Sequence, residues 1–319
     1  MRQIDLQDIF AAYGRLRETV RETPFEEVEA PDLGSGNHLF LKCENRQITG
    51  SFKIRGALNK ISCLSREEKS KGVITASSGN HAQGVAYAAN LFHIPAKVIV
   101  PTSTPSEKIN AARKLGAEVV VAGDNYDLSE TIAIDLADRK DMTYVHAFND
   151  PEIMAGQGTV AFEMLISQPE IDTLIVPAGG GGLMTGMAIC AKSINPRIKV
   201  IGVQSEASPP WYHAMKEGRV VEVEYKDSLA EGLTGRITNE VFKIARQLVD
   251  EIVLVEESAI KEAVQWLMRR QQIVEGAGAV GVAALRTGKI EAFGKMGIVL
   301  SGGNIDLDRL SSLTDKETN

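Results

Sequence analysis

Short apolar runs alternate with longer amphipathic stretches along most of this chain. The first stretch, over 4–19, has apolar residues at helical spacing and ends before a proline at 24, so it predicts a helix. Most of the later runs are apolar without interruption, which is typical of strands buried on both faces in parallel sheets. The predicted strands are 38–43, 73–76, 97–100, 118–122, 173–177, 199–203, 251–255 and 297–300. Strands of this kind separated by helices predict an α/β fold.

The predicted strands fall into two groups. Those at 73–76, 97–100 and 118–122 lie close together with helix-sized spacers, whereas those from 173 onward are more widely spaced. We therefore expect two open, twisted, mainly parallel sheets, with helices on both faces of each and a cleft between them. Ligands usually bind beyond the carboxyl ends of such strands, so the cleft is the expected place for a site.

Composition narrows the function classes. The 319 residues are 44% hydrophobic and 24% charged, with a net charge of −7 and both signs interspersed, so we expect no nucleic-acid partner. The three cysteines, at 43, 63 and 190, are far apart and form no CxxC pair, which argues against a disulfide framework or a thiolate zinc site. No run approaches 18 apolar residues and no signal peptide is evident, so we expect a cytoplasmic protein without membrane insertion.

Four consecutive glycines follow the predicted strand at 173–177 and precede a helical pattern that begins at Leu183. They are Gly179, Gly180, Gly181 and Gly182. Glycines let the backbone approach a ligand closely, and free N–H groups at a helix start attract phosphate. Neither the P-loop pattern nor GxGxxG fits these residues, which favours a single phosphate ester or mononucleotide over ATP or NAD. The alternative is a turn that only packs a strand tightly against a helix.

Three further polar segments stand beside predicted strands: 44–56, 77–84 and 301–304. Each is weak evidence alone, because a lysine such as Lys53 is usually a surface charge and Ser78 or Asn80 could serve only as a helix cap. Their shared position at strand ends favours one common site.

Together, these segments resemble the threonine dehydratase and serine racemase family. The motif Ser-Phe-Lys-Ile-Arg-Gly-Ala at 51–57, the stretch 77–84, the four glycines and Ser-Gly-Gly-Asn at 301–304 have that family's order and spacing. The resemblance covers nearly the whole chain and implies a tryptophan-synthase-β-like fold, fold type II of the pyridoxal-phosphate enzymes. It also implies a large domain of 1–50 and 147–319, a small domain of 51–146, an active site in the cleft between them, and a homodimer or homotetramer.

The resemblance also assigns roles to residues. Lys53 would hold pyridoxal 5′-phosphate as a Schiff base and remove the Cα proton of a small amino-acid substrate. Ser301 would face the pyridine nitrogen and Asn80 the ring 3′ oxygen. The implied cofactor contacts are Phe52, Lys53, Asn80, Gly179, Gly180, Gly181, Gly182, Leu183, Glu275 and Ser301. The implied substrate contacts are Ser77, Asn80, His81 and Gly232.

The expected reaction is a dehydration with loss of ammonia. A serine hydroxyl at 301 does not stabilise a protonated pyridinium as an aspartate would, so the ring is a weaker electron sink and prompt loss of a β-hydroxyl is favoured. L-Threonine or L-serine would then give a 2-oxo acid and ammonia.

Two alternatives stay open within this family. Ser78 stands where racemases have a second base, so an amino-acid racemase with side dehydratase activity is possible; a helix cap is the other interpretation. The bulky segment 208–213 is either a surface loop or a part of the substrate pocket. In the second case hydroxyaspartate, phenylserine or a hydroxyectoine-derived acid becomes a candidate substrate.

No metal is expected. The carboxylates that hold a divalent cation in related racemases fall here on Gln204 and Pro210, with Ser208 between them, and hard cations prefer carboxylate ligands. A ligand-binding protein that kept the fold without the chemistry is disfavoured, because a pure binder has no need of the amine of Lys53.

Overall fold

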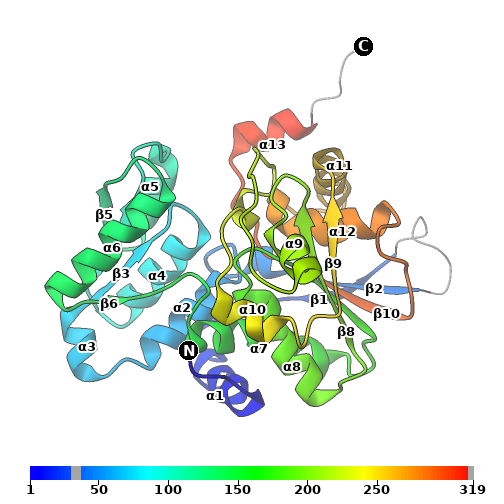
Figure 1. Ribbon diagram of the computed structural model, residues 1–319, viewed down its shortest axis with the longest axis horizontal. Coiled ribbons are helices and arrows are strands. Elements are labelled where there is room, and N and C mark those ends of the chain that lie inside the picture. Colours follow the sequence, from blue (N-terminus) through cyan, green and yellow to red (C-terminus); the bar gives the residue numbers. More distant parts are fainter. Residues whose placement is uncertain (30–36, 315–319) are drawn as a thin grey trace.

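The computed structural model describes residues 1–29 and 37–314, which form two sheets with surrounding helices (Figure 1). The larger sheet has the strand order β1-β2-β10-β7-β8-β9. Its strands are β1 Phe25–Val28, β2 His38–Lys42, β7 Thr173–Pro177, β8 Lys199–Ser205, β9 Glu251–Val255 and β10 Lys295–Val299. The smaller sheet, with the order β5-β4-β3-β6, is parallel throughout. Its strands are β3 Val73–Ala76, β4 Ala96–Val100, β5 Glu118–Val121 and β6 Thr143–Tyr144.

The predicted α/β fold with two mainly parallel sheets is confirmed, with one difference. Strand β1 pairs with β2 in the antiparallel direction, so the larger sheet is mixed. Its sequence, Phe-Glu-Glu-Val, has no continuous apolar run: Phe25 packs against Phe40, with ring centroids 5.3 Å apart, while the two glutamates are exposed. A short edge strand of this kind gives no pattern that hydrophobic periodicity can detect.

Helices cover both sheets, and in Figure 1 α13 lies at the top of the half that holds the larger sheet, near α11. The first helix, predicted over 4–19, is shorter because Asp5 forms a capping box with Asp8 at its start. The helices are α1 Leu6–Leu16, α2 Lys53–Ser62, α3 Arg66–Lys71, α4 Asn80–Leu91, α5 Ser106–Lys114, α6 Tyr126–Lys140, α7 Pro151–Ser167, α8 Gly182–Ile194, α9 Pro210–Glu217, α10 Asn239–Ala245, α11 Glu257–Met268, α12 Gly276–Arg286 and α13 Leu307–Thr314, with 3₁₀ turns η2 Glu44–Arg46 and η3 Glu231–Leu233. In the described ranges no helix has both the length and the apolar character needed to cross a membrane.

Helix α2, which begins with Lys53, is fixed to the core by close helix packing. A Cβ on Gly56 would lie 2.9 Å from the carbonyl oxygen of Ile153, and one on Gly156 would lie 2.7 Å from the Cα of Gly56. Real Cβ atoms do not approach other atoms so closely, so the backbones of α2 and α7 meet only because both positions are glycine.

A buried ion-pair network also holds α2. The Arg55 guanidinium donates to Glu44 at 2.8 Å and to Glu163 at 2.6 Å, and Lys42 donates to Glu163 at 2.6 Å. All four side chains are buried, and the two positive charges match the two negative ones. Buried charges require such pairing, because an unpaired one costs several kcal/mol of desolvation, on the order of 3–5 kcal/mol when a partner is removed. The network therefore fixes the start of α2 relative to β2 and α7.

Candidate active site

Lys53 lies at the first position of α2, half-buried, with its ammonium group directed at the backbone of another segment. Its Nζ donates to the carbonyl oxygen of Ala147 at 3.1 Å and lies 5.3 Å from the ring centroid of Phe52. Removal from bulk water lowers the pKa of Lys53 to about 8, against a smaller opposing effect of the Glu275 carboxylate. A lysine with this pKa is partly neutral near pH 7 and can act as a nucleophile or base.

Residues 179–182, the glycine loop, connect β7 to α8 and are packed between two aromatic rings. A Cβ on Gly180 would overlap the Phe148 ring, and one on Gly181 would overlap the Trp211 ring, both at separations under 3.0 Å. Gly181 also has φ +97, a conformation that side chains rarely adopt. Both features require glycine here.

The glycine loop presents free backbone donors. Within residues 1–29 and 37–314, the backbone N–H groups of 179–183 donate to no acceptor. Further along the chain, the N–H of Thr185 donates to the carbonyl oxygen of Gly181. Helix α8 begins at this point, so these donors carry the partial positive charge of a helix N-terminus. The arrangement is suited to a phosphate group.

A second helix start stands on the smaller sheet, where residues 77–81, the serine loop, connect β3 to α4. The N-cap of α4 is Gly79, whose N–H donates to Ser77 Oγ at 3.2 Å, and no side chain caps the helix. The interpretation of Ser78 or Asn80 as a helix cap is therefore wrong. Among the described residues the Ser78 hydroxyl makes no hydrogen bond, and the backbone N–H groups of Asn80 and His81 donate to no acceptor.

The His81 ring is buried and neutral. Its Nε2 lies 3.0 Å from the carbonyl oxygen of Val145, while its Nδ1 has no partner among the described residues. Burial, reinforced by the nearby Lys53 ammonium, lowers the pKa of His81 to about 3. The single ring N–H is therefore used on Val145, and the donor that His81 can offer to a ligand is its backbone N–H.

Asn80 connects the serine loop to the larger sheet. Its Nδ2 donates to Glu275 Oε1 at 2.7 Å, and its Oδ1 accepts from Asn304 at 2.8 Å. Burial raises the pKa of Glu275 to about 7, and the hydrogen bond from Asn80 opposes this effect. Glu275 therefore keeps its proton to a higher pH than an exposed glutamate does. One N–H of Asn80 remains for a ligand.

Ser301 and Gly232 lie beside these groups. The carbonyl oxygen of Ser301 accepts from the N–H of Phe52 at 3.1 Å, which places Ser301 next to Lys53. A Cβ on Gly232 would lie 3.7 Å from Glu275 Oε1, and the carbonyl oxygen of Gly232 lies close to Gly179. The structure thus brings the sequence-predicted residues together, at the ends of β3, β7 and β10 and the start of α2.

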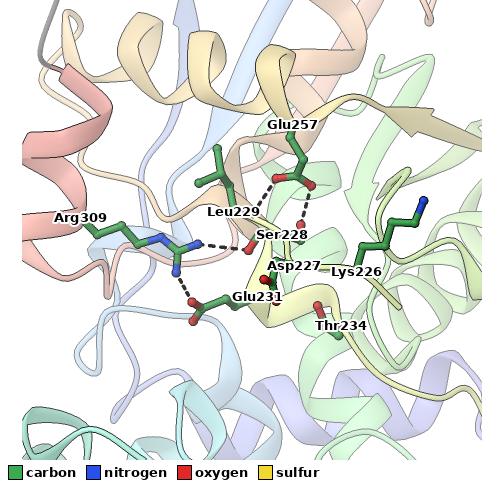
Figure 2. Close-up of a pocket in the computed structure, with 8 residues that line it drawn as sticks. All are labelled: Lys226, Asp227, Ser228, Leu229, Glu231, Thr234, Glu257 and Arg309. Atoms are coloured by element: carbon green, nitrogen blue, oxygen red, sulfur yellow. Dashed lines mark hydrogen bonds and ion pairs between the residues drawn. The ribbon is translucent and has the colours of Figure 1, made fainter. Parts of the chain in front are cut away.

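A cavity of about 670 Å³ opens next to Gly232 but is lined by other side chains (Figure 2). Glu257 accepts from Ser228 Oγ and from the N–H of Leu229, both at 2.6 Å, and Arg309 is paired with Glu231. Glu231 also binds Lys108 of α5 at 3.1 Å. These contacts tie the segment around η3 to α13 and, across the gap between the sheets, to α5.

A family model described as "Pyridoxal-phosphate dependent enzyme" matches residues 16–302. This chain belongs to that family. It is 42% identical over 316 residues to an L-threonine ammonia-lyase of Thermotoga maritima, covering 98% of this chain and 79% of the relative. It is 40% identical over 316 residues to the catabolic L-threonine dehydratase TdcB of Escherichia coli K12, covering 98% and 96%. The structure of maize serine racemase superposes with a TM-score of 0.92 at 33% identity, covering 98% of this chain and 97% of the racemase.

The cofactor of this enzyme is therefore pyridoxal phosphate, as the family resemblance implied. The residues present fit it. A phosphate has unused N–H donors at the glycine loop, and an aldehyde has the partly neutral amine of Lys53. Three buried polar atoms near these elements have no partner among the described residues, as is expected around a polar ligand. They are Ser51 Oγ, His81 Nδ1 and Thr185 Oγ1.

Sequence reasoning missed several residues of this site. The segment 208–213, interpreted as a loop or pocket wall, in fact starts helix α9 at Pro210, and Trp211 is fully buried against the glycine loop. Proline at the first helical position was the available signal. Phe148 gave no signal of its own, because its contacts with the glycine loop are made across a long sequence separation. Asn304 belongs to the polar segment 301–304 but was given no role there; it donates to Asn80.

Where related racemases hold a divalent cation, the Gln204 amide here donates to the carbonyl oxygen of Ala178 and accepts from the N–H of Trp211 in α9. In the part of the chain that the structure describes, no group of three or more His, Cys, Asp or Glu side chains is arranged to hold a metal ion.

Proposed function

We propose that this enzyme is an ammonia-lyase that removes water and ammonia from a β-hydroxy amino acid, L-threonine or L-serine, to give a 2-oxo acid. The observation that supports it most is the amine of Lys53, which has a lowered pKa and donates to Ala147, the neighbour of the Phe148 ring that packs on the glycine loop. The threonine ammonia-lyase and dehydratase relatives at about 40% identity support the same substrate class.

We propose that the cofactor and the substrate lie in the cleft between a small domain, 51–146, and a large domain formed by the rest of the chain. The glycine loop and Leu183 bind the cofactor phosphate through N–H groups at the start of α8, and the N–H groups at the start of α4 bind the substrate carboxylate. Phe52 would flank the cofactor ring, and Asn80, Ser301 and Glu275 would contact its polar atoms.

Pyridoxal phosphate, when bound, withdraws electrons from the substrate Cα and so makes the Cα proton acidic. Lys53 holds the cofactor and then accepts this proton, for which a pKa near 8 is well matched to neutral pH. Ser301, if it faces the ring nitrogen, would offer a neutral hydroxyl in place of a negative charge, and this would favour early departure of the β-hydroxyl.

Amino-acid racemisation is a second candidate activity, supported by one observation. The Ser78 hydroxyl neither caps α4 nor bonds another described residue, so it is available as a second acid or base. Racemisation requires such a group in addition to Lys53.

We further propose a cytoplasmic homodimer or homotetramer. The three cysteines form no disulfide, which suits a reducing compartment. Apolar side chains are exposed on α1 and α7, where Phe10 (63% exposed) contacts Phe162 and Ile166 (58% exposed) lies one turn further along α7. Sedimentation of the purified protein tests the assembly: a monomer at micromolar concentration contradicts it.

The activity is tested by incubating the purified protein, loaded with pyridoxal phosphate, with a panel of hydroxy amino acids. The panel contains L-threonine, L-serine, hydroxyaspartate and phenylserine, and each reaction is assayed for 2-oxo acid and for the D-isomer. We expect 2-oxo acid from threonine or serine. If none of these substrates yields a 2-oxo acid, the proposed function is wrong.

A further inference from the structure

The carbonyl group just before the glycine loop is held by a buried glutamine. Gln204 is 0% exposed near the end of β8, and its Nε2 donates to the carbonyl oxygen of Ala178 at 3.0 Å. Its Oε1 accepts from the N–H groups of Trp211 at 2.9 Å and Tyr212 at 3.2 Å. Helix α9 has no side-chain cap of its own, since its N-cap residue is Pro209. One amide therefore caps α9 and ties it to the chain entering the glycine loop.

The carbonyl group of Gly179, the next along the chain, accepts a hydrogen bond from the Trp211 side chain. Trp211 is also 0% exposed, and its indole Nε1 donates to the carbonyl oxygen of Gly179 at 2.6 Å. Its ring occupies the space where a Cβ of Gly181 would stand. Two consecutive carbonyls of the chain thus accept hydrogen bonds from one buried unit, Gln204 with the first turn of α9.

These two bonds fix the direction of the donors on the other side of the loop. In a planar trans peptide the C=O of one residue and the N–H of the next point in opposite directions. With the carbonyls of 178 and 179 turned toward α9, the N–H groups of Gly179 and Gly180 point away from it. The Phe148 ring packs against Gly180 from another side, and the Cβ and backbone of Phe148 pack against Gly182. Ala147, the neighbour of Phe148 in the chain, accepts the hydrogen bond of Lys53.

We propose that Gln204 and Trp211 are positioning residues for the cofactor phosphate. They hold the peptide planes of the glycine loop in the orientation in which its N–H groups converge, so that no reorganisation is needed when a phosphate binds. The inference rests on the proposed function in taking the glycine loop as the phosphate site. It adds a specific expectation, because loss of either residue should weaken binding through the phosphate and leave the aldehyde chemistry of Lys53 unchanged.

Two variants separate these effects. Trp211→Phe keeps an aromatic ring against Gly181 and removes only the N–H that binds Gly179. Gln204→Met keeps the volume of the side chain and removes all three hydrogen bonds. The matched control is Trp266→Phe on α11, since Trp266 is equally enclosed (3% exposed) but packs beneath the Arg270 guanidinium, 3.5 Å from the ring centroid.

The experiment compares pyridoxal phosphate with pyridoxal, which lacks the phosphate. The holoenzyme of each variant is stripped of cofactor, and the full-length apoprotein is titrated with both compounds while the near-visible absorbance band is recorded. For Trp211→Phe we expect the Kd for pyridoxal phosphate to rise roughly tenfold, equivalent to about 1.4 kcal/mol, and for Gln204→Met to rise further. The Kd for pyridoxal should stay within about twofold of wild type in both variants, and Trp266→Phe should change neither, as expected for a residue distant from the loop.

The outcomes distinguish the two proposals. If a variant loses affinity equally for pyridoxal phosphate and for pyridoxal, Gln204 and Trp211 have only a general structural role. If the affinity for both compounds is unchanged, the hydrogen bonds of these two residues do not contribute to binding. Either result overturns the positioning inference alone. Wild-type apoprotein that binds neither compound overturns the proposed function itself. Thermal unfolding of each apoprotein verifies that the variants are folded at the titration temperature.

Discussion

The glycine loop and the serine loop both join a buried parallel strand to a helix, yet they are held very differently. The glycine loop is packed between Phe148 and Trp211, and two carbonyls at its entrance are hydrogen-bonded to Gln204 and Trp211. In the serine loop, Ser78 makes no hydrogen bond within the described residues, and a Cβ on Gly79 would meet nothing within 4 Å. We interpret the first as a rigid support for a permanent cofactor and the second as a more adaptable support for a substrate that binds and leaves.

The largest expected effect comes from crowding the rigid loop. Gly181→Ala would place a Cβ against the Trp211 ring at a residue with φ +97. We expect the free energy of unfolding to fall by roughly 2–4 kcal/mol and cofactor affinity to fall with it, measured by urea unfolding and by absorbance titration. Gly14→Ala on α1, where a Cβ meets nothing within 4 Å, is the control and should be neutral or slightly stabilising. A Gly181→Ala protein as stable as wild type would remove the evidence that this loop is rigid.

An effect of intermediate size is expected on the pH dependence of the unfolding free energy when Glu275, which accepts a hydrogen bond from Asn80 of the serine loop, is replaced. The raised pKa, about 7, means that the folded state keeps a proton on Glu275 between pH 4.5 and 7 that the unfolded state has lost. This stabilising contribution is therefore full at acid pH and is lost as the pH rises through 7. Glu275→Gln cannot lose a proton, so its apoprotein should gain about 2–3 kcal/mol of unfolding free energy relative to wild type between pH 5 and 8. A constant difference across this range, in urea unfolding, would contradict the raised pKa.

Smaller effects are expected in the serine loop. Gly79→Ala has open space and a negative φ, so its unfolding free energy should change by less than about 1 kcal/mol, and cofactor affinity should be unaffected. If Gly79→Ala costs as much as Gly181→Ala, the two loops do not differ in rigidity.

Ser78→Ala should change the rate of 2-oxo acid formation least, by less than about threefold, because the residue neither caps α4 nor holds another described side chain. Any racemisation should disappear, since the proposed second acid or base is removed. Chiral analysis of recovered substrate measures both reactions in one sample. Equal loss of dehydration and racemisation would show that Ser78 serves a step common to both.

Much of the fold was predictable because buried parallel strands leave continuous apolar runs, such as those of β3 and β7. The site loops were predictable for a related reason: parallel strands place their carboxyl ends at one edge, so polar motifs after them meet. The resemblance to a family then assigned their roles. Strand β1 and the two-residue β6 were missed, because their pairing depends on neighbours in space rather than on a local pattern.

The positions of Gln204 and Trp211 beside the glycine loop could not be predicted from the sequence either. Nothing in the neighbourhood of Gln204 indicates that its amide would join Ala178 to α9, and Trp211 resembled a bulky loop residue until its indole N–H was found on Gly179. Such contacts depend on the packing of elements far apart in the chain. Sequence patterns therefore indicated the groups that we propose to contact the ligands more readily than the groups that support them.

The central claim is that Lys53 carries the cofactor, and borohydride reduction tests it most directly. The purified protein, saturated with pyridoxal phosphate, is reduced and digested, and the modified peptide is identified by mass spectrometry. We expect loss of the near-visible band and one phosphopyridoxyl group on Lys53, with no such label in Lys53→Ala. A label on a different lysine of the wild-type protein, or a band that persists in Lys53→Ala, would contradict it.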